Sequence, residues 1–517
     1  MNRTLRYAVC VAATGAVATT LVLPSGSATA AGSKDSILRT YTADTWRSMA
    51  AMADPGTGLV SDHIGGDLSP ATRAEYTSPT NIGAYIWSAV AARKTGLITA
   101  ADEVSRVQKT LTTLQRLEIH EPSGMFYNWY DPKTGAKLTA WPEENKDGGH
   151  DTVYPFLSSV DNGWLATALI IVKDQMPTLA AQADTVLTKM DFGYYYDPAE
   201  RQIRGGFWKD PPAECSVPGN YRGGATVYYT CHHYGAFNTE PRMASYLGIA
   251  AEQIEPLHYF GTYRTFPGDN CDWSWTEQRG QGVYRTYLGQ RVFEGSYGYR
   301  GMRFVPTWGG SMFEALMVPL FVPEEKWGTK SWAITHPTYV QAQIEHGKEE
   351  AGYGYWGFSP ASDPRGGYRE YGVDQLGMNP DGYTSDHQRT TVDEGYAGCP
   401  DRPAQPAPTS YGEGEVTPHA SFLALRYARG PAMANLAKLR RNFDAYGTGG
   451  FYDTVNVKTG QVAKRYLSLD QGMVMAALGN VLGGDVLRHA FAQGPMEQRV
   501  APLMRMEEFS LTPTGTP

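Results

Sequence analysis

Apolar residues at helical spacing recur along the chain in segments that alternate between uniformly apolar and amphipathic. Each apolar segment begins at a Ser or Thr, a residue type whose side chain accepts hydrogen bonds from the free N–H groups of a first helical turn. A buried helix followed by an amphipathic one, repeated around a closed array, is typical of two concentric helical rings. The sequence therefore predicts an all-α fold, an (α/α)6 toroid. The apolar helices begin near Thr80, Ser159, Thr239, Ser311, Thr417 and Ser468.

The individual helices follow from this alternation. Two of the apolar ones share a frame, SVDNG at 159–163 and SLDQG at 468–472, in which Ser and Asp are both expected to cap the helix and the Gly to bring backbone close to a ligand. The predicted helices are 35–53, 82–93, 99–118, 159–173, 178–190, 238–251, 311–321, 336–346, 417–427, 432–443 and 468–482.

The segments between the helices carry turn signals. Aromatic–Asp pairs followed by Pro or Gly at 130–135, 196–199 and 451–460 predict short β-hairpins on one rim of the toroid. The interval 359–416 is rich in Gly, Pro and Tyr and predicts a long loop. The closed array leaves no separate domains, so we expect a single catalytic domain over 31–517.

The N-terminus has the pattern of a secretory signal peptide. Arg3 and Arg6 precede an apolar stretch over 8–23, and Ala28-Thr29-Ala30 offers a cleavage site after Ala30. No later run is long and apolar enough to cross a membrane. We therefore expect a secreted, soluble protein that acts as a monomer.

The composition limits the classes of molecule that the protein is expected to bind. The net charge of −8 argues against a nucleic-acid binder, which normally presents a basic face. The 33 Tyr and 12 Trp fit either a large aromatic core or a groove lined with rings.

Removal of Cys10 with the signal peptide would leave four cysteines in an oxidising compartment, which allow three pairings. The pairing of Cys215 with Cys231 and of Cys271 with Cys399 is preferred, because the first pair closes a short Pro- and Gly-rich loop.

Acidic residues at the starts of the apolar helices are the candidates for chemistry. If these helices run parallel, their N-termini share one rim, and Asp161, Glu240 and Glu314 lie on it. A pair of carboxyl groups in opposed environments is what glycosidic cleavage requires. Each acid also has a structural alternative: Asp161 and Asp470 as caps, and Glu314 as the partner of Ser311 in a capping box.

Other side chains near the same rim are candidates for contacting substrate. Aromatic side chains can stack on the faces of sugars. A single Trp or Tyr is nevertheless more often part of a hydrophobic core than of a binding surface. The candidates are Tyr76, Asn81, Trp129, Trp164, Arg242, Trp308, Trp356 and Asp470.

The sequence contains no complete motif for binding a metal or a cofactor. His232-His233 lacks a third ligand at a usual spacing, and no Cys-x-x-Cys or His-Glu-x-x-His is present. The Asp-rich turns at 54–62 and at Asp131 lack the full spacing of a calcium loop and are interpreted as plain turns. The sequence predicts no metal and no cofactor.

Six stretches of the mature chain resemble the glycoamylase-like family, which includes bacterial endo-β-1,2-glucanases and the processing domain of cyclic β-1,2-glucan synthases. The resemblance implies an α/α toroid that acts on glucans, usually with inversion, and its functional acids map onto Asp161, Glu240 and, less directly, Glu314. Some of these glucanases carry a second acid where this chain has Trp164, and synthase-type relatives carry a Glu after the Trp-Gly motif, which is absent after Trp356. The stretches are YTSPTNIG at 76–83, GMFYNWYD at 124–131, SSVDNG at 158–163, EPRM at 240–243, SMFEALM at 311–317 and LDQG at 469–472.

The sequence thus predicts a secreted glycoside hydrolase that cleaves within a polysaccharide, with a β-1,2-glucan as first substrate. Glu240 is the expected general acid, Asp161 the base or water-positioning carboxylate, and Glu314 the alternative catalytic acid. One rival is a polysaccharide lyase, in which His232 or Tyr234 is the base and Arg242 neutralises a uronate. The other is a non-catalytic glycan-binding protein whose acids are only caps.

Overall fold

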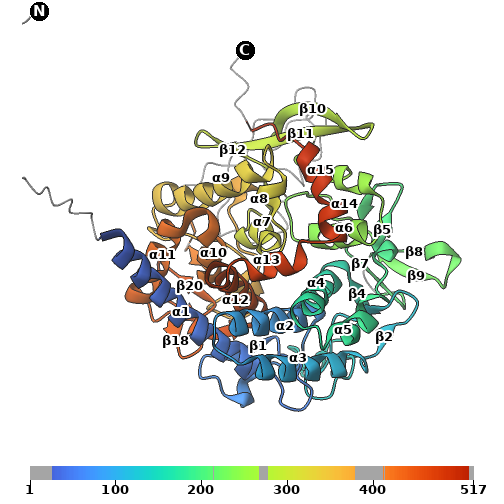
Figure 1. Ribbon diagram of the computed structural model, residues 1–517, viewed down its shortest axis with the longest axis horizontal. Coiled ribbons are helices and arrows are strands. Elements are labelled where there is room, and N and C mark those ends of the chain that lie inside the picture. The colour runs from blue at the N-terminus through green and yellow to red at the C-terminus, as the bar shows by residue number, and fades with distance from the viewer. Residues whose placement is uncertain (1–25, 213–214, 267–277, 379–410, 413, 512–517) are drawn as a thin grey trace, which may run out of the picture.

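The computed structural model describes residues 26–212, 215–266, 278–378, 411–412 and 414–511, with backbone only for 26–34. The chain proceeds once around the molecule, from the blue helices through green and yellow to orange (Figure 1). All six predicted apolar helices are present, and all except α6 begin at or next to their predicted starts. They are α2 (Pro79–Lys94), α4 (Ser159–Gln175), α6 (Arg242–Ala250), α7 (Met312–Leu316), α10 (Pro418–Leu423) and α12 (Ser468–Gly483).

The remaining helices lie mostly outside these six (Figure 1). In α3 only one face is buried, whereas α2 is buried from Pro79 through Ala92. That difference is the one that the apolar and amphipathic patterns predict. The helices are α1 (Gly26–Met52), α3 (Ala100–Leu114), α5 (Ala180–Leu187), α8 (Glu324–Trp327), α9 (Trp332–Glu345), α11 (Leu425–Asn442), α13 (Val486–Phe491), α14 (Pro495–Arg499) and α15 (Ala501–Met506).

The six apolar helices contact one another in sequence order. Helix α2 packs against α12 and α4, α4 packs against α6, and α10 packs against both α7 and α12. Arg242 at the start of α6 donates to the backbone carbonyls of Glu314 and Ala315 in α7, at 3.0 and 2.8 Å. This order of neighbours is that of the predicted inner ring, while the toroid as a whole stays a prediction.

Glycines allow the inner helices to approach closely. A Cβ atom at Gly472 would lie 2.6 Å from the Ala84 side chain, and one at Gly163 would lie 3.3 Å from that of Ala244. The two glycines of the repeated frame therefore serve helix packing, and the expectation that they face a ligand is wrong. Between the helices, the rings of Trp87, Trp164 and Phe321 meet with centroids 4.9 to 6.1 Å apart.

Three inner helices are shorter than predicted. Helix α7 ends at Leu316, and Pro319 lies in the 3-10 turn Val318–Leu320 that follows, because proline cannot donate the next helical hydrogen bond. Helix α6 begins only at Arg242, and α10 ends at Leu423. Only α6 is shortened at its N-terminal end, where the preceding loop carries Glu240.

The all-α prediction omits a considerable amount of sheet. Strands β10 and β11 form a long antiparallel pair extended by β12, and β4, β7, β9 and β8 form a four-stranded sheet. The predicted turn regions at 196–199 and 451–460 do join antiparallel strands, β5 with β6 and β20 with β21. Asp54 and Asp131 accept hydrogen bonds from backbone N–H groups two and three residues later, as plain turns do.

The strands are mostly short. They are β1 (His63–Gly65), β2 (Ile119–His120), β3 (Met125–Phe126), β4 (Phe156–Ser158), β5 (Tyr196–Asp197), β6 (Gln202–Ile203), β7 (Gly206–Trp208), β8 (Ser216–Gly219), β9 (Val227–Thr230), β10 (Gln281–Tyr287), β11 (Gln290–Tyr299), β12 (Met302–Phe304), β13 (Thr307–Trp308), β14 (Ala361–Ser362), β15 (Tyr368–Arg369), β16 (Gly377–Met378), β17 (Glu415–Val416), β18 (Tyr446–Gly447), β19 (Gly450–Phe451), β20 (Thr454–Asn456), β21 (Val462–Ala463) and β22 (Arg465–Leu467).

Several predictions concern residues outside the described part of the chain. Cys215 and Cys231 form the predicted disulfide, whereas Cys271 and Cys399 lie outside the described residues. So do residues 1–25 of the predicted signal peptide and most of the loop 359–416, of which 359–378 contains β14, β15 and β16. Among the helices that the structure describes, none combines the length and the apolar character needed to span a membrane.

Candidate active site

Asp161 lies in the first turn of α4 and does not cap it. The cap is Ser158, whose Oγ accepts from the Asp161 N–H at 3.1 Å, while Ser159 donates to backbone carbonyls. Asp161 Oδ1 accepts from Thr80 Oγ1 at 2.7 Å, and Oδ2 accepts from the Asn128 amide at 2.8 Å once that amide is oriented to satisfy both of its atoms. The expectation that Ser159 and Asp161 cap the helix is therefore wrong, and the Asp161 carboxylate is directed toward side chains of other elements.

Glu240 lies in the loop just before α6, beside Pro241. Its Oε2 accepts from Trp164 Nε1 at 2.7 Å, which leaves Oε1 to carry a proton. Burial, followed by the negative charge of Glu314, raises the pKa of Glu240 well above its usual value, and Asp161 adds to the rise. These neighbours favour the protonated carboxylic acid, the form that a general acid needs.

Glu314 is buried in the first turn of α7 and holds the Glu240 loop in place. Its Oε2 accepts from Thr239 Oγ1 and, at 2.8 Å, from the Glu240 N–H. Ser311 Oγ accepts from the Glu314 N–H at 3.2 Å, which is one half of the predicted capping box. Because Thr239 donates to Glu314, it does not cap α6 as its position had suggested.

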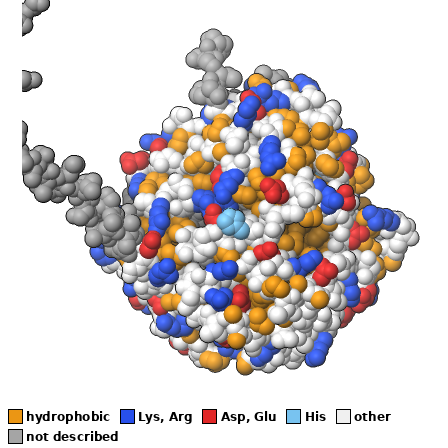
Figure 2. Space-filling view, viewed as in Figure 1, with side chains coloured by type: hydrophobic (Ala, Val, Ile, Leu, Met, Phe, Trp, Pro, Cys, Tyr) orange, Lys and Arg blue, Asp and Glu red, His pale blue; other side chains and the backbone are white. Residues whose placement is uncertain are grey.

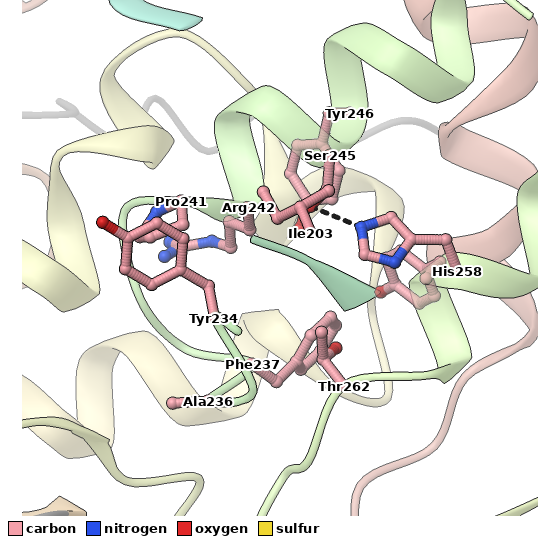
Figure 3. Close-up of a pocket in the computed structure, with 11 residues that line it drawn as sticks. Ile203, Tyr234, Ala236, Phe237, Pro241, Arg242, Ser245, Tyr246, His258 and Thr262 are labelled. Atoms are coloured by element: carbon pink, nitrogen blue, oxygen red, sulfur yellow. Dashed lines mark hydrogen bonds between the residues drawn. The ribbon is translucent and has the colours of Figure 1, made fainter. Parts of the chain in front are cut away.

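Tyr234 shows that the three acids face a common region. Burial and then the charges of Glu240, Asp161 and Glu314 raise the pKa of its hydroxyl above the usual value. Figure 3 shows Tyr234 beside Pro241 and Arg242, on the opposite side from the hydrogen-bonded pair Ser245 and His258. Asp161, Glu240 and Glu314 are far apart in the sequence and are brought together here, as the helix starts predict.

Arg242 is not available to a substrate. It is 3 % exposed and forms a bidentate ion pair with Glu324, with distances of 2.8 and 3.0 Å. Predicting it as a sugar contact was wrong, and the lyase alternative loses the cation that it would need to neutralise a uronate. Trp164 and Trp356 are fully buried, so they present no face to a sugar and are corrected in the same way.

A cluster of partly exposed rings adjoins Asp161. The ring centroids of Tyr76 and Trp129 are 5.5 Å apart, and Trp141 lies 4.5 Å from Tyr76 and 5.3 Å from Trp129. Trp129 Nε1 donates to the reoriented Asn128 amide at 3.3 Å, and Asn128 in turn contacts Asp161. Tyr76 and Trp129 were predicted, whereas Trp141 was missed because it lies in a polar loop without periodicity. Trp308 is also partly exposed.

The two remaining candidates are buried. Asn81 donates to Asp62 Oδ1 at 3.0 Å, and Asp470 is 2 % exposed beside Asp453 and His419. Tyr368 interacts electrostatically with Asp470 and Asp453 and, more weakly, with Glu370 and Glu240, which relates this second cluster to the acids.

A separate groove lies at the other ends of α4 and α6. It has a volume of about 640 Å³ and is lined by residues of α4, α5, α6, α13 and α14, including Ile170, Leu247 and Phe491. Figure 2 shows a hydrophobic hollow on the face where these helices lie in Figure 1. None of Asp161, Glu240 and Glu314 lines this groove, so its shape says nothing about their chemistry.

Sequence comparisons match parts of this chain to known proteins. The glycoamylase family model, described as "Putative glucoamylase", matches residues 274–494, and a model described as "Protein of unknown function" matches residues 40–213. The cyclic β-(1,2)-glucan synthase NdvB of Rhizobium meliloti is 22 % identical over 87 % of this chain. The chain spans only 18 % of that relative's length. The resemblance to the glycoamylase-like family is thereby confirmed.

Solved structures share the fold. An endo-β-1,2-glucanase from Chitinophaga pinensis superposes with a TM-score of 0.62 at 15 % identity, over 91 % of this chain and 98 % of that one. A β-1,2-glucanase from Parabacteroides distasonis gives 0.62 at 15 % identity, over 92 % and 60 %. An endo-β-1,2-glucanase from Talaromyces funiculosus gives 0.58 at 12 % identity, over 94 % and 92 %. At these identities the likeness establishes a common helix-rich fold.

Proposed function

We propose that this protein is a secreted glycoside hydrolase that cleaves within a glucan, with a β-1,2-linked glucan as its substrate. The observation that carries the proposal is the convergence of Asp161, Glu240 and Glu314, in which burial and two like-charged neighbours raise the pKa of Glu240. The shared fold with endo-β-1,2-glucanases supports the substrate class. We further propose a single (α/α)6 domain over 31–517 that acts as a monomer.

The carboxyl groups divide the chemistry between them. Protonated Glu240 donates its proton to the glycosidic oxygen as the bond to the anomeric carbon breaks. Asp161, held by Thr80 and Asn128, removes a proton from a water that attacks the opposite face of the sugar. The proposed outcome is inversion at the anomeric carbon. Glu314 fixes the Glu240 loop and keeps its acid protonated.

The rings of Tyr76, Trp129 and Trp141 provide the surface on which the glucan is proposed to rest. Their partly exposed faces adjoin Asp161 through Asn128, and aromatic faces bind the apolar C–H faces of sugars. This places a sugar unit next to the carboxylate that activates water.

The test is the variant Glu240→Gln on linkage-defined glucans. Gln has the size of Glu and still accepts from Trp164, so the fold should persist while turnover falls by at least about a thousandfold, the scale on which general acids contribute. Glu121→Gln, on an exposed turn, is the matched control. Chromatography gives the products and NMR their anomeric form. Near-normal activity of Glu240→Gln would show that Glu240 is not the general acid. An unsaturated product that absorbs in the ultraviolet would show that the reaction is elimination and not hydrolysis.

A further inference from the structure

Three residues that play no part in the proposed cleavage meet in the interior near the inner-helix starts. His419 lies in the first turn of α10, Asp470 in the first turn of α12, and Asp453 between β19 and β20. Each is 2 % exposed. One nitrogen or oxygen from each lies within 4.8 Å of the others, and His419 Nδ1 approaches Asp470 Oδ2 at 3.3 Å.

The polar atoms of this cluster lack hydrogen-bond partners in the described part of the chain. This holds for both His419 nitrogens, both Asp470 carboxylate oxygens and Asp453 Oδ1. Asp453 Oδ2 accepts from the Ser362 N–H at 2.6 Å. The large majority of buried side-chain polar atoms in proteins find a partner, so several unpaired ones at one place indicate an occupant. A proton shared by the two carboxylates would still leave His419 Nε2 unpaired.

The charges point to a cation as that occupant. Within the described residues, no Lys or Arg forms an ion pair with Asp453 or Asp470, and His419 approaches Asp470 alone at ion-pair distance. Neither ring nitrogen of His419 has a hydrogen-bond partner among the described residues, so the imidazole has a nitrogen to offer to a cation. Two uncompensated carboxylates in the interior carry a large desolvation cost, which a doubly charged ion offsets.

We propose that His419, Asp453 and Asp470 bind a divalent cation of the zinc and manganese class. Imidazole nitrogen together with carboxylate oxygen suits these ions, whereas calcium prefers a cage of oxygens alone. The cavity beside the three residues, lined also by Thr45 and Phe451, measures about 10 Å³, which is room for one small occupant.

The proposed ion ties four elements together. His419 and Asp470 connect α10 to α12, Asp453 adds the connection between β19 and β20, and the Ser362 N–H on Asp453 adds β14. The site goes beyond the proposed hydrolysis and does not depend on it. It stabilises the part of the fold that carries the starts of α10 and α12, and its loss should lower the melting temperature of the protein.

The test is a metal titration of the full-length mature chain. The protein is dialysed against a chelator, and Zn²⁺ and Mn²⁺ are added separately while binding is followed by calorimetry, elemental analysis and melting temperature. We expect one ion per chain and a higher melting temperature, with at least tenfold weaker binding for Asp470→Asn and for His419→Gln. Asp210→Asn, at an exposed position, should bind as the unaltered protein does.

Two results would overturn the site. One is the absence of stoichiometric binding of either ion by the unaltered protein, which decides the question even if a variant fails to fold. The other is equal binding by folded Asp470→Asn or His419→Gln, with folding checked by circular dichroism. Because binding and melting are measured without substrate, the outcome is independent of whether the protein hydrolyses glucans.

Discussion

The variant Glu314→Gln tests how the acid of this site is kept protonated. It removes one negative charge next to Glu240, yet the Gln carbonyl oxygen can still accept from Thr239 and from the Glu240 N–H. Glu314 Oε2 is 2.8 Å from the Glu240 nitrogen, and one further side-chain length puts the two carboxyl groups on the order of 6 Å apart. With an effective dielectric constant of about 20, the repulsion is about 2.8 kcal/mol.

Because Glu314→Gln removes that repulsion, the pKa of Glu240 should fall, and it should stay above the usual value because burial is the larger cause of the rise. The sign is fixed by the chemistry: a general acid is active while protonated, so the alkaline limb of the kcat/KM profile follows its pKa. We expect this limb to move to lower pH, with activity retained on the acidic side.

The assay is initial rate against pH on a β-1,2-glucan, with Glu121→Gln measured in parallel and folding checked by circular dichroism. An alkaline limb that stays in place, or that moves to higher pH, refutes the argument that the charge of Glu314 raises the Glu240 pKa. Loss of activity at every pH would instead make Glu314 the catalytic acid, which is the alternative that the sequence left open.

Two further predictions concern stability and processing. Burial raises the pKa of Glu324, but the charge of Arg242 and hydrogen bonds from His336 and Arg242 outweigh it and lower that pKa from 4.5 to about 2. The Glu324 carboxylate stabilises the folded protein above pH 4.5. As the pH falls from 4.5 to about 2, the free energy of unfolding should therefore decrease by about 3 kcal/mol. Urea titrations should show a shallower pH dependence in Glu324→Gln, and an equal slope would contradict the assignment. Mass spectrometry of the exported protein should find a mature chain starting at Ala31, and retention of residues 1–30 would rule out the predicted cleavage.

The residues of the site could be named from the sequence only in part. Asp161, Glu240 and Glu314 were predictable because each follows a local helix-start signal and a family motif. Burial was not predictable: Arg242, Trp164 and Trp356 were expected to meet sugar, and all three lie in the interior. An arginine or a tryptophan fits a core as well as a cleft, and the choice depends on neighbours such as Glu324, which no local pattern shows.

The sequence by itself determined where the inner helices other than α6 begin, because a Ser or Thr followed by an apolar run is a local signal. It did not determine how far they extend, since α7 ends where Pro319 and its packing require. Only the tertiary structure decided the electrostatics. The pKa of Glu240 depends on carboxylates from two other helices, and the proposed metal site joins His419, Asp453 and Asp470 from three separate segments. Charge interactions act through space, so their outcome is set by the packing that brings distant residues together.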